Sequence, residues 1–155
     1  MQTIMQAIQA RLRSELAYVR DRDIFIAPSV YSINSGAKMP CIGIKDGRPE
    51  LTELACCAAE WSLPVHLVIF VKLAKEPERS IIGDTSTTRA GVLAIADDIR
   101  RLLVGNLLGL EPEVQAALLT SESESEMFVD PATNGIQRKQ LTITYTKEVQ
   151  LPCGS

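Results

Sequence analysis

The fold is decided by the stretch LPVHLVIFVKL, which occupies residues 63–73. Every second residue from Leu63 to Leu73 is aliphatic, so one face of the stretch is wholly apolar. The opposite face is half apolar and holds His66, Val68 and Phe70. This alternation predicts a central β-strand that is partly covered on both sides.

Other segments around this strand give weaker or more local signals. In residues 140–149, apolar residues and threonines alternate, which predicts an antiparallel strand with one exposed face. Shorter strands are expected at residues 24–26 and 39–45, and the second leads into an Asp-Gly turn. Residues 51–61 fit either a helix or a strand: their Leu, Ala and Glu content favours a helix, while their position favours a meander.

Two segments carry apolar residues at helical spacing, namely residues 2–20 and residues 90–108. Residues 117–129 are expected to be extended. The order of elements predicts an α+β fold: a single β-sheet, antiparallel or mixed, with the N-terminal helix and a long central helix packed on one face. Residues 1–149 are expected to form one domain, and residues 150–155 a flexible tail.

Composition narrows the function classes. The chain has 155 residues, 46% hydrophobic residues and a formal net charge of −3, which fits one globular domain. It has no dense basic run, so stable binding to nucleic acid is not expected. Its apolar runs of about five residues are far shorter than the roughly 20 that span a bilayer. We expect no membrane association, no signal peptide and a cytoplasmic site of synthesis.

The four cysteines, at positions 41, 56, 57 and 153, show no metal-binding spacing. Cys56 and Cys57 are neighbours and are expected to point to opposite sides of the chain. The single histidine, His66, completes no zinc set. We expect four reduced, buried thiols, which are typical of a reducing compartment.

No segment predicts an active site. His66 lies inside the strongest strand, where a hydrogen-bonded histidine on a covered sheet face is expected. Residues 83–88 begin a helix but lack the Gly-Lys-Ser/Thr ending of a phosphate loop, so they are interpreted as a helix cap. Asp97 and Asp98 are interpreted as a solvated helix face. The chain is therefore expected to be no enzyme and to need no cofactor or metal.

The repeat Ser-Glu-Ser-Glu-Ser-Glu at residues 121–126 is the one unusual motif. Strand alternation puts Glu122, Glu124 and Glu126 on one face. They fit a solvated arm whose charge discourages edge-to-edge pairing. They also fit an acidic surface that, repeated around a ring, lines a channel so that DNA slides without sticking.

Three local patterns resemble the tail-terminator (tail-completion or head-tail joining) proteins of tailed bacteriophages. The first is the opening helix running into Arg22-Asp23-Ile24-Phe25, and the second is Lys38-Met39-Pro40-Cys41-Ile42-Gly43-Ile44 followed by the strand at residues 64–71. The third is the helix at residues 90–108 leading into the closing strand Leu141-Thr142-Ile143-Thr144-Tyr145.

This resemblance implies a small structural virion protein without catalytic residues. It implies a hexameric ring that caps the tail tube, ends tail polymerisation and offers a surface to the head or neck. The implied partners are further copies of the chain, the tail tube protein and neck, head-completion or sheath proteins, while DNA passes through without specific binding. The implied location is the tail-neck junction of a virion assembled in the host cytoplasm. The alternatives are another head-tail connector or neck ring protein, or a small α+β ligand-binding domain.

A ring subunit needs surfaces that bind its neighbours. Ile81 and Ile82 lie in the polar connection at residues 74–84 and are candidate apolar anchors. The closing strand is expected to present a free edge that extends a neighbour's sheet, with Thr142, Thr144 and Thr146 as candidate contacts.

Overall fold

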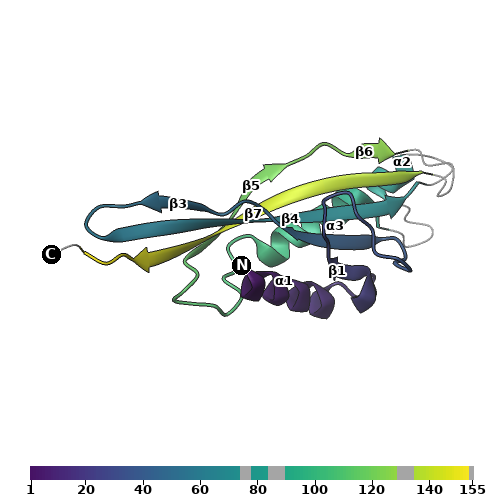
Figure 1. The fold of residues 1–155 in the computed structure, drawn as a ribbon. Coiled ribbons are helices and arrows are strands. Elements are labelled where there is room, and N and C mark those ends of the chain that lie inside the picture. Colours follow the sequence, from purple (N-terminus) through teal and green to yellow (C-terminus); the bar gives the residue numbers. More distant parts are fainter. Residues whose placement is uncertain (74–77, 84–89, 129–134, 154–155) are drawn as a thin grey trace.

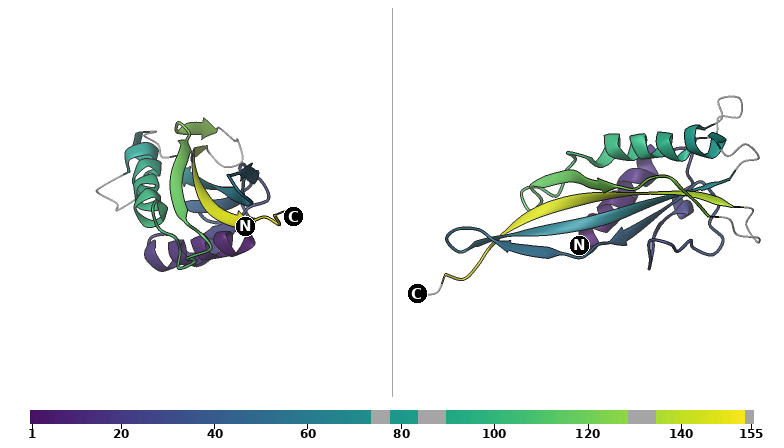
Figure 2. Two further views of the ribbon diagram at one scale, coloured as in Figure 1. Left: turned by 90° about the vertical axis from the view of Figure 1, so that its left-hand side faces the viewer. Right: turned by 90° about the horizontal axis from the view of Figure 1, so that it is seen from above.

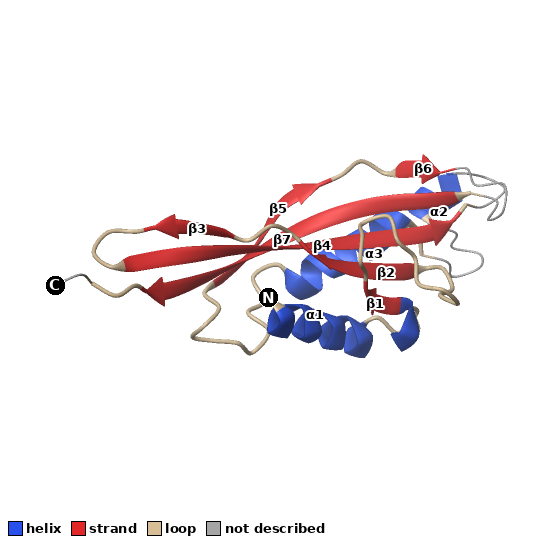
Figure 3. Cartoon of the chain, viewed as in Figure 1, coloured by secondary structure: helices blue, strands red, loops and turns tan. Residues whose placement is uncertain are grey.

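The computed structural model describes residues 1–73, 78–83, 90–128 and 135–153 of the chain (Figures 1 and 3). Its centre is a seven-stranded sheet in the order β1-β2-β4-β7-β5, with β3 also pairing with β4 and β6 with β7. The helices are α1 (Gln2–Glu15), η1 (Asp21–Asp23, a 3-10 turn), α2 (Glu78–Ile82) and α3 (Val92–Leu103). The strands are β1 (Ile24–Ile26), β2 (Cys41–Asp46), β3 (Glu50–Glu53), β4 (Ala58–Lys72), β5 (Ala116–Glu122), β6 (Glu126–Phe128) and β7 (Ile136–Gln150).

The predicted fold class is wrong. The sheet is mixed, which the prediction allowed, since β1 runs parallel to β2 while the other pairs are antiparallel. The prediction fails because strands, and not helices, hold most of the regular structure. The expected long central helix is α3, which has only 12 residues. It ends because Val104 is extended and Gly105 turns the chain with a φ of +74°. The opening helix, α1, likewise ends at Glu15 rather than near residue 20.

The strands β4 and β7 are the longest elements, with 15 residues each. They pair along their whole length, from Ala58 opposite Gln150 to Lys72 opposite Ile136. At about 3.3 Å per residue, each spans roughly 45–50 Å. The ambiguous residues 51–61 form most of β3, a turn and the start of β4.

Both helices that carry core residues lie on one face of the sheet (Figure 2). On that face, β4 and β7 pack Leu67, Ile69 and Ile143 against Leu12 of α1 and Ile99 of α3, all fully buried. On the opposite face a smaller cluster is covered by residues of the segment 27–39. Its buried members are Phe25, Ala27, Cys41, Val68 and Phe70.

One end of the sheet extends beyond the helices as an arm, which we define as residues 50–62 and 146–153 (Figures 1 and 3). It contains the β3–β4 hairpin and the end of β7. All four residues of β3 are exposed. At the hairpin turn, Cys56 and Cys57 have φ values of 53° and 64°, a left-handed conformation that costs a residue with a side chain about 1 kcal/mol or more.

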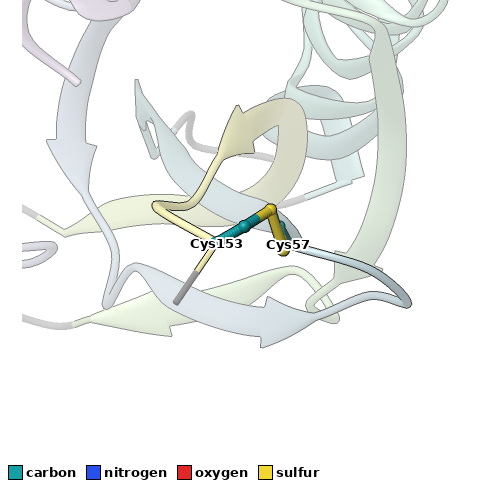
Figure 4. Close-up of a disulfide and its surroundings, with 2 residues drawn as sticks. All are labelled: Cys57 and Cys153. Atoms are coloured by element: carbon teal, nitrogen blue, oxygen red, sulfur yellow. A yellow bond between two sulfur atoms is a disulfide. The ribbon is translucent and has the colours of Figure 1, made fainter. Parts of the chain in front are cut away.

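A disulfide between Cys57 and Cys153 closes the arm (Figure 4). The N–H of Leu151 also donates to the carbonyl of Cys57 at 2.6 Å, so the segment after β7 is fixed to the hairpin turn. The expectation of four reduced thiols is wrong, and the cysteines give no argument for a reducing compartment. Cys41 is free and buried, and Cys56 is free and exposed.

Removal of this crosslink is expected to destabilise the chain. The bridge joins residues 96 positions apart, so the variant Cys153→Ser frees a long loop in the unfolded state. We expect the free energy of unfolding in urea to decrease by about 2–4 kcal/mol. The exposed Cys56→Ser is the matched control and should change little. Equal stabilities of the Cys153→Ser variant and the wild type would show that the bridge does not form in solution.

Candidate assembly surfaces

The end of the sheet opposite the arm carries an exposed aromatic pair. Tyr31 is 67% exposed and Phe128 is 41% exposed, although aromatic residues make up only 5% of the chain. Their rings meet edge to face, with centroids 6.4 Å apart. The guanidinium carbon of Arg138 lies 4.6 Å from the centroid of Tyr31, within cation-π distance.

The guanidinium of Arg138 fixes the position of Tyr31 in this aromatic pair. Its guanidinium donates to the carbonyl of Val30 from Nε at 3.1 Å and from Nη2 at 2.9 Å, and to Oε1 of Gln140 at 2.8 Å. Glu126 lies 3.5 Å away as its ionic partner. Burial lowers the pKa of Arg138 below that of an exposed arginine, but an arginine stays charged at neutral pH. The loop that carries Tyr31 is therefore fixed to the sheet.

Two exposed lysines lie at the same end of the sheet as the aromatic pair. Lys72 ends β4 opposite Ile136, and Phe128 pairs with Ile136 from the other side. Lys38 lies in the segment that covers the same face, and its N–H donates to Asp23 at 2.9 Å. We call this region the end surface and define it by Tyr31, Lys38, Lys72, Glu126, Phe128 and Arg138. It carries three cations and one carboxylate.

The arm has the opposite charge. It holds four glutamates and one lysine, and its net charge of −3 equals the formal net charge of the whole chain. It also exposes Leu51 and Leu54, whose side chains are 48% and 42% exposed. The arm has no helix on either face, so these leucines are open to a partner.

The prediction that Glu122, Glu124 and Glu126 share one strand face is wrong. A register shift between Leu119 and Ser121 displaces Glu122, and residues 123–125 separate β5 from β6. Glu122 lies opposite Leu141, on the helix face, while Glu126 lies opposite Arg138, on the other face. A lumen role for Glu122, Glu124 and Glu126 stays a prediction.

Glu122 belongs to an ion network that joins α3 to the sheet. Its carboxylate accepts from Nε and Nη2 of Arg100 at 3.0 and 2.6 Å and pairs with Nζ of Lys139 at 3.0 Å. The hydrogen bond from Arg100 holds the pKa of Glu122 below 4.5, with Lys139 adding to the effect and burial opposing it. Lys139 also donates to the carbonyl of Ser123 at 2.6 Å, which fixes the break between β5 and β6.

The candidate anchors Ile81 and Ile82 lie in α2 and have different environments. Ile81 is partly buried and packs against the main core, whereas Ile82 is 70% exposed. The main chain of α2 lies against the start of α3, because a Cβ at Gly91 would meet the carbonyl oxygen of Ile81 at 2.3 Å. Of the two, only Ile82 is available to a partner without repacking.

The closing strand has no free edge at its threonines, because β7 pairs with β4 on one side and with β5 on the other. Thr142 is buried, and its Oγ1 lies 2.8 Å from Nδ1 of His66. Thr144 shares a hydrogen bond with Thr120. Thr146 lies between Ser62 and Ala116 in the sheet register. Contacts of these three side chains with a neighbouring subunit stay predictions.

The remaining polar residues behave as structural groups. His66 is hydrogen-bonded on a partly covered face, as predicted, and burial together with Lys45 lowers its pKa below 6.5. Asp97 pairs with Arg100 and Asp98 with Arg101 on the α3 surface. Within the described ranges, no three His, Cys, Asp or Glu side chains are placed to hold a metal ion. The cap expected at residues 84–88 lies outside the described residues.

A surface hollow of about 550 Å³ lies between α1 and the loop after α3. It is lined by Ala7, Ala10, Arg11, Ser14, Asn106, Leu108 and Gly109. In the part of the chain that is described, no helix has the length and hydropathy needed to cross a bilayer.

Sequence reasoning missed both the arm and the end surface. Tyr31 and Phe128 are 97 positions apart in numbering, and only the fold brings them together over Arg138. For the arm, the neighbouring Cys56 and Cys57 together with Cys153 near the C-terminus were an available signal of a crosslink.

Comparison with known proteins supports the fold but not an identity. No protein-family model matches the sequence, and no curated protein matches it either. Among solved structures, the fold is similar to a chain of the virion of a native gene transfer agent particle, with a TM-score of 0.55 and 14% sequence identity. The match covers 94% of each chain. At this identity the two chains share the fold.

The ion network predicts a pH-dependent contribution to stability. The variant Glu122→Gln should lower the free energy of unfolding at neutral pH by at most about 1 kcal/mol, since the network is partly exposed. Because the pKa of Glu122 is lowered on folding, this difference should be present above pH 4.5 and vanish as the pH falls through the folded-state pKa. Urea unfolding of the variant and the wild type at several pH values measures this difference. The control is Glu124→Gln, which changes an exposed glutamate outside the ion network. A deficit that persists unchanged in acid would contradict the assignment.

Proposed function

We propose that the protein is a structural component of a phage-like particle, and that it forms a ring that caps a tail tube. The observation that carries this proposal is the fold match to a chain of a gene transfer agent virion over 94% of both chains. The match spans nearly the whole chain, so the fold as a whole, and not one local motif, is shared. The sequence resemblance to tail terminators supports the finer assignment.

In this proposal the chain acts as one domain and by contact rather than by catalysis. Copies of the chain associate into a ring of six subunits, which is the number that the resemblance to tail terminators implies.

 The ring then binds the last layer of tail tube protein, ends polymerisation and offers its outer surface to neck, head-completion or sheath proteins. DNA passes through the centre without specific binding. The assembled protein is located in the virion, at the junction of tail and neck.

The test measures tube growth and mass together. Tail tube protein from the same particle is polymerised with and without this protein, and tube lengths are recorded by electron microscopy. We expect sub-stoichiometric amounts to shorten the tubes and to place a ring at one end. In light scattering, the ring should have about six times the subunit mass of 17.0 kDa. A monomer that neither binds tube ends nor changes tube length would contradict the proposal, and binding to portal complexes instead would favour a neck ring.

Ile82 provides a residue-level prediction for the same assay. The variant Ile82→Ser removes an exposed apolar side chain and should weaken ring formation while leaving the fold intact. We expect on the order of tenfold more protein for half-maximal assembly, with an unchanged melting temperature. Leu118→Ser on β5 is the matched control, because Leu118 is also exposed, at 57%. Normal assembly of Ile82→Ser would remove α2 from the interface.

A further inference from the structure

The arm and the end surface lie at opposite ends of the same two strands (Figure 1). Ala58 begins β4 in the arm, and Lys72 ends it at the end surface. Because the strand is continuous and about 45–50 Å long, the arm of a molecule does not reach its own end surface. If the two surfaces bind each other, they do so between molecules.

The two surfaces have opposite charges, and both expose apolar side chains. The arm carries four glutamates and one lysine, and the end surface carries Lys38, Lys72 and Arg138 against Glu126. The arm exposes Leu51 and Leu54, and the end surface exposes an aromatic pair. Aromatic residues and arginine are the residue types that dominate binding energy at protein interfaces.

The end surface is also preorganised. Arg138 makes two hydrogen bonds to the carbonyl of Val30 and lies over the ring of Tyr31, so the exposed ring is held before any partner arrives. The arm is fixed at its tip by the Cys57–Cys153 bridge. Rigid surfaces lose little conformational entropy on association, which favours binding.

We infer that the arm of one copy docks on the end surface of the next copy, so that the chains associate head to tail. This inference rests on the proposed function, since it supplies the subunit contact of the ring. A contact between two different surfaces of identical chains is heterologous, and it closes into a ring when the rotation between neighbours allows it.

The experiment uses two variants that each lose one surface. The arm variant is Leu51→Ser with Leu54→Ser, and the end variant is Tyr31→Ser with Phe128→Ser. All four side chains are at least 41% exposed, so both variants should fold, which melting curves check. Leu118→Ser is the control for loss of an exposed apolar side chain outside both surfaces.

A head-to-tail contact predicts that each variant alone does not assemble and that the two variants pair when mixed. Each variant alone should fail to assemble at concentrations at least about tenfold above those at which the wild type assembles. In an equimolar mixture, the intact arm of the end variant can bind the intact end surface of the arm variant. The mixture should therefore give a heterodimer of two subunit masses and nothing larger, because the other two surfaces are altered. Native mass spectrometry, with the arm variant isotopically labelled, identifies the species.

Two outcomes would overturn the inference. Assembly of either variant alone as in the wild type would show that its altered surface is not the contact. A mixture that stays monomeric would show that the surfaces do not bind each other. Failure of this inference can be distinguished from failure of the proposed function. A wild type that forms no ring, alone or on tube ends, contradicts the proposed function. A wild type that forms a ring, together with variants that also assemble, contradicts only the arm contact.

Discussion

The continuous pairing of β4 with β7 is the constraint on which the rest of the structure depends. Fifteen residues of each strand are in register, from the arm to the end surface. In the middle of this ladder one face packs against α1 and α3, and the other is covered by the segment 27–39. Beyond the helices the same ladder continues as the arm. Body, arm and end surface are therefore joined by one continuous pair of strands.

The sequence predicts the middle of this ladder well and its ends poorly, for a physical reason. In residues 63–73 alternation reports burial on one face, so the strand is visible. The alternation continues through Trp61 and Ala59, but the Leu, Ala and Glu content of residues 51–61 favours a helix, so the start of the strand was not decided by the sequence. The end of α3 depends on the extended backbone of Val104, and the faces of Glu122 and Glu126 depend on a register shift. Neither leaves a periodic signal.

The sequence patterns also do not predict contacts between residues that are far apart in the chain. Spacing alone does not say that Cys57 pairs with Cys153, because four cysteines allow several pairings. Nor does it bring Tyr31 and Phe128 together over Arg138. These contacts decide the two candidate assembly surfaces: a negatively charged arm with exposed leucines, and a positively charged end with exposed aromatic rings. The virion role proposed for the fold gives both surfaces a use, since a ring subunit contacts two neighbours through different sides.

The most direct test of this account uses the one exposed free thiol. Cys41 is buried, with a pKa that burial raises to about 12, and Cys57 and Cys153 are bonded, so a photo-activated cross-linker attaches selectively to Cys56 in the arm. After illumination of the assembled protein, peptide mass spectrometry locates the attachment point on the neighbour. A head-to-tail contact should give links to the end surface, around Tyr31, Lys38 and Phe128, and only between chains. Links to a second arm, or to the helices of the neighbour, would contradict it.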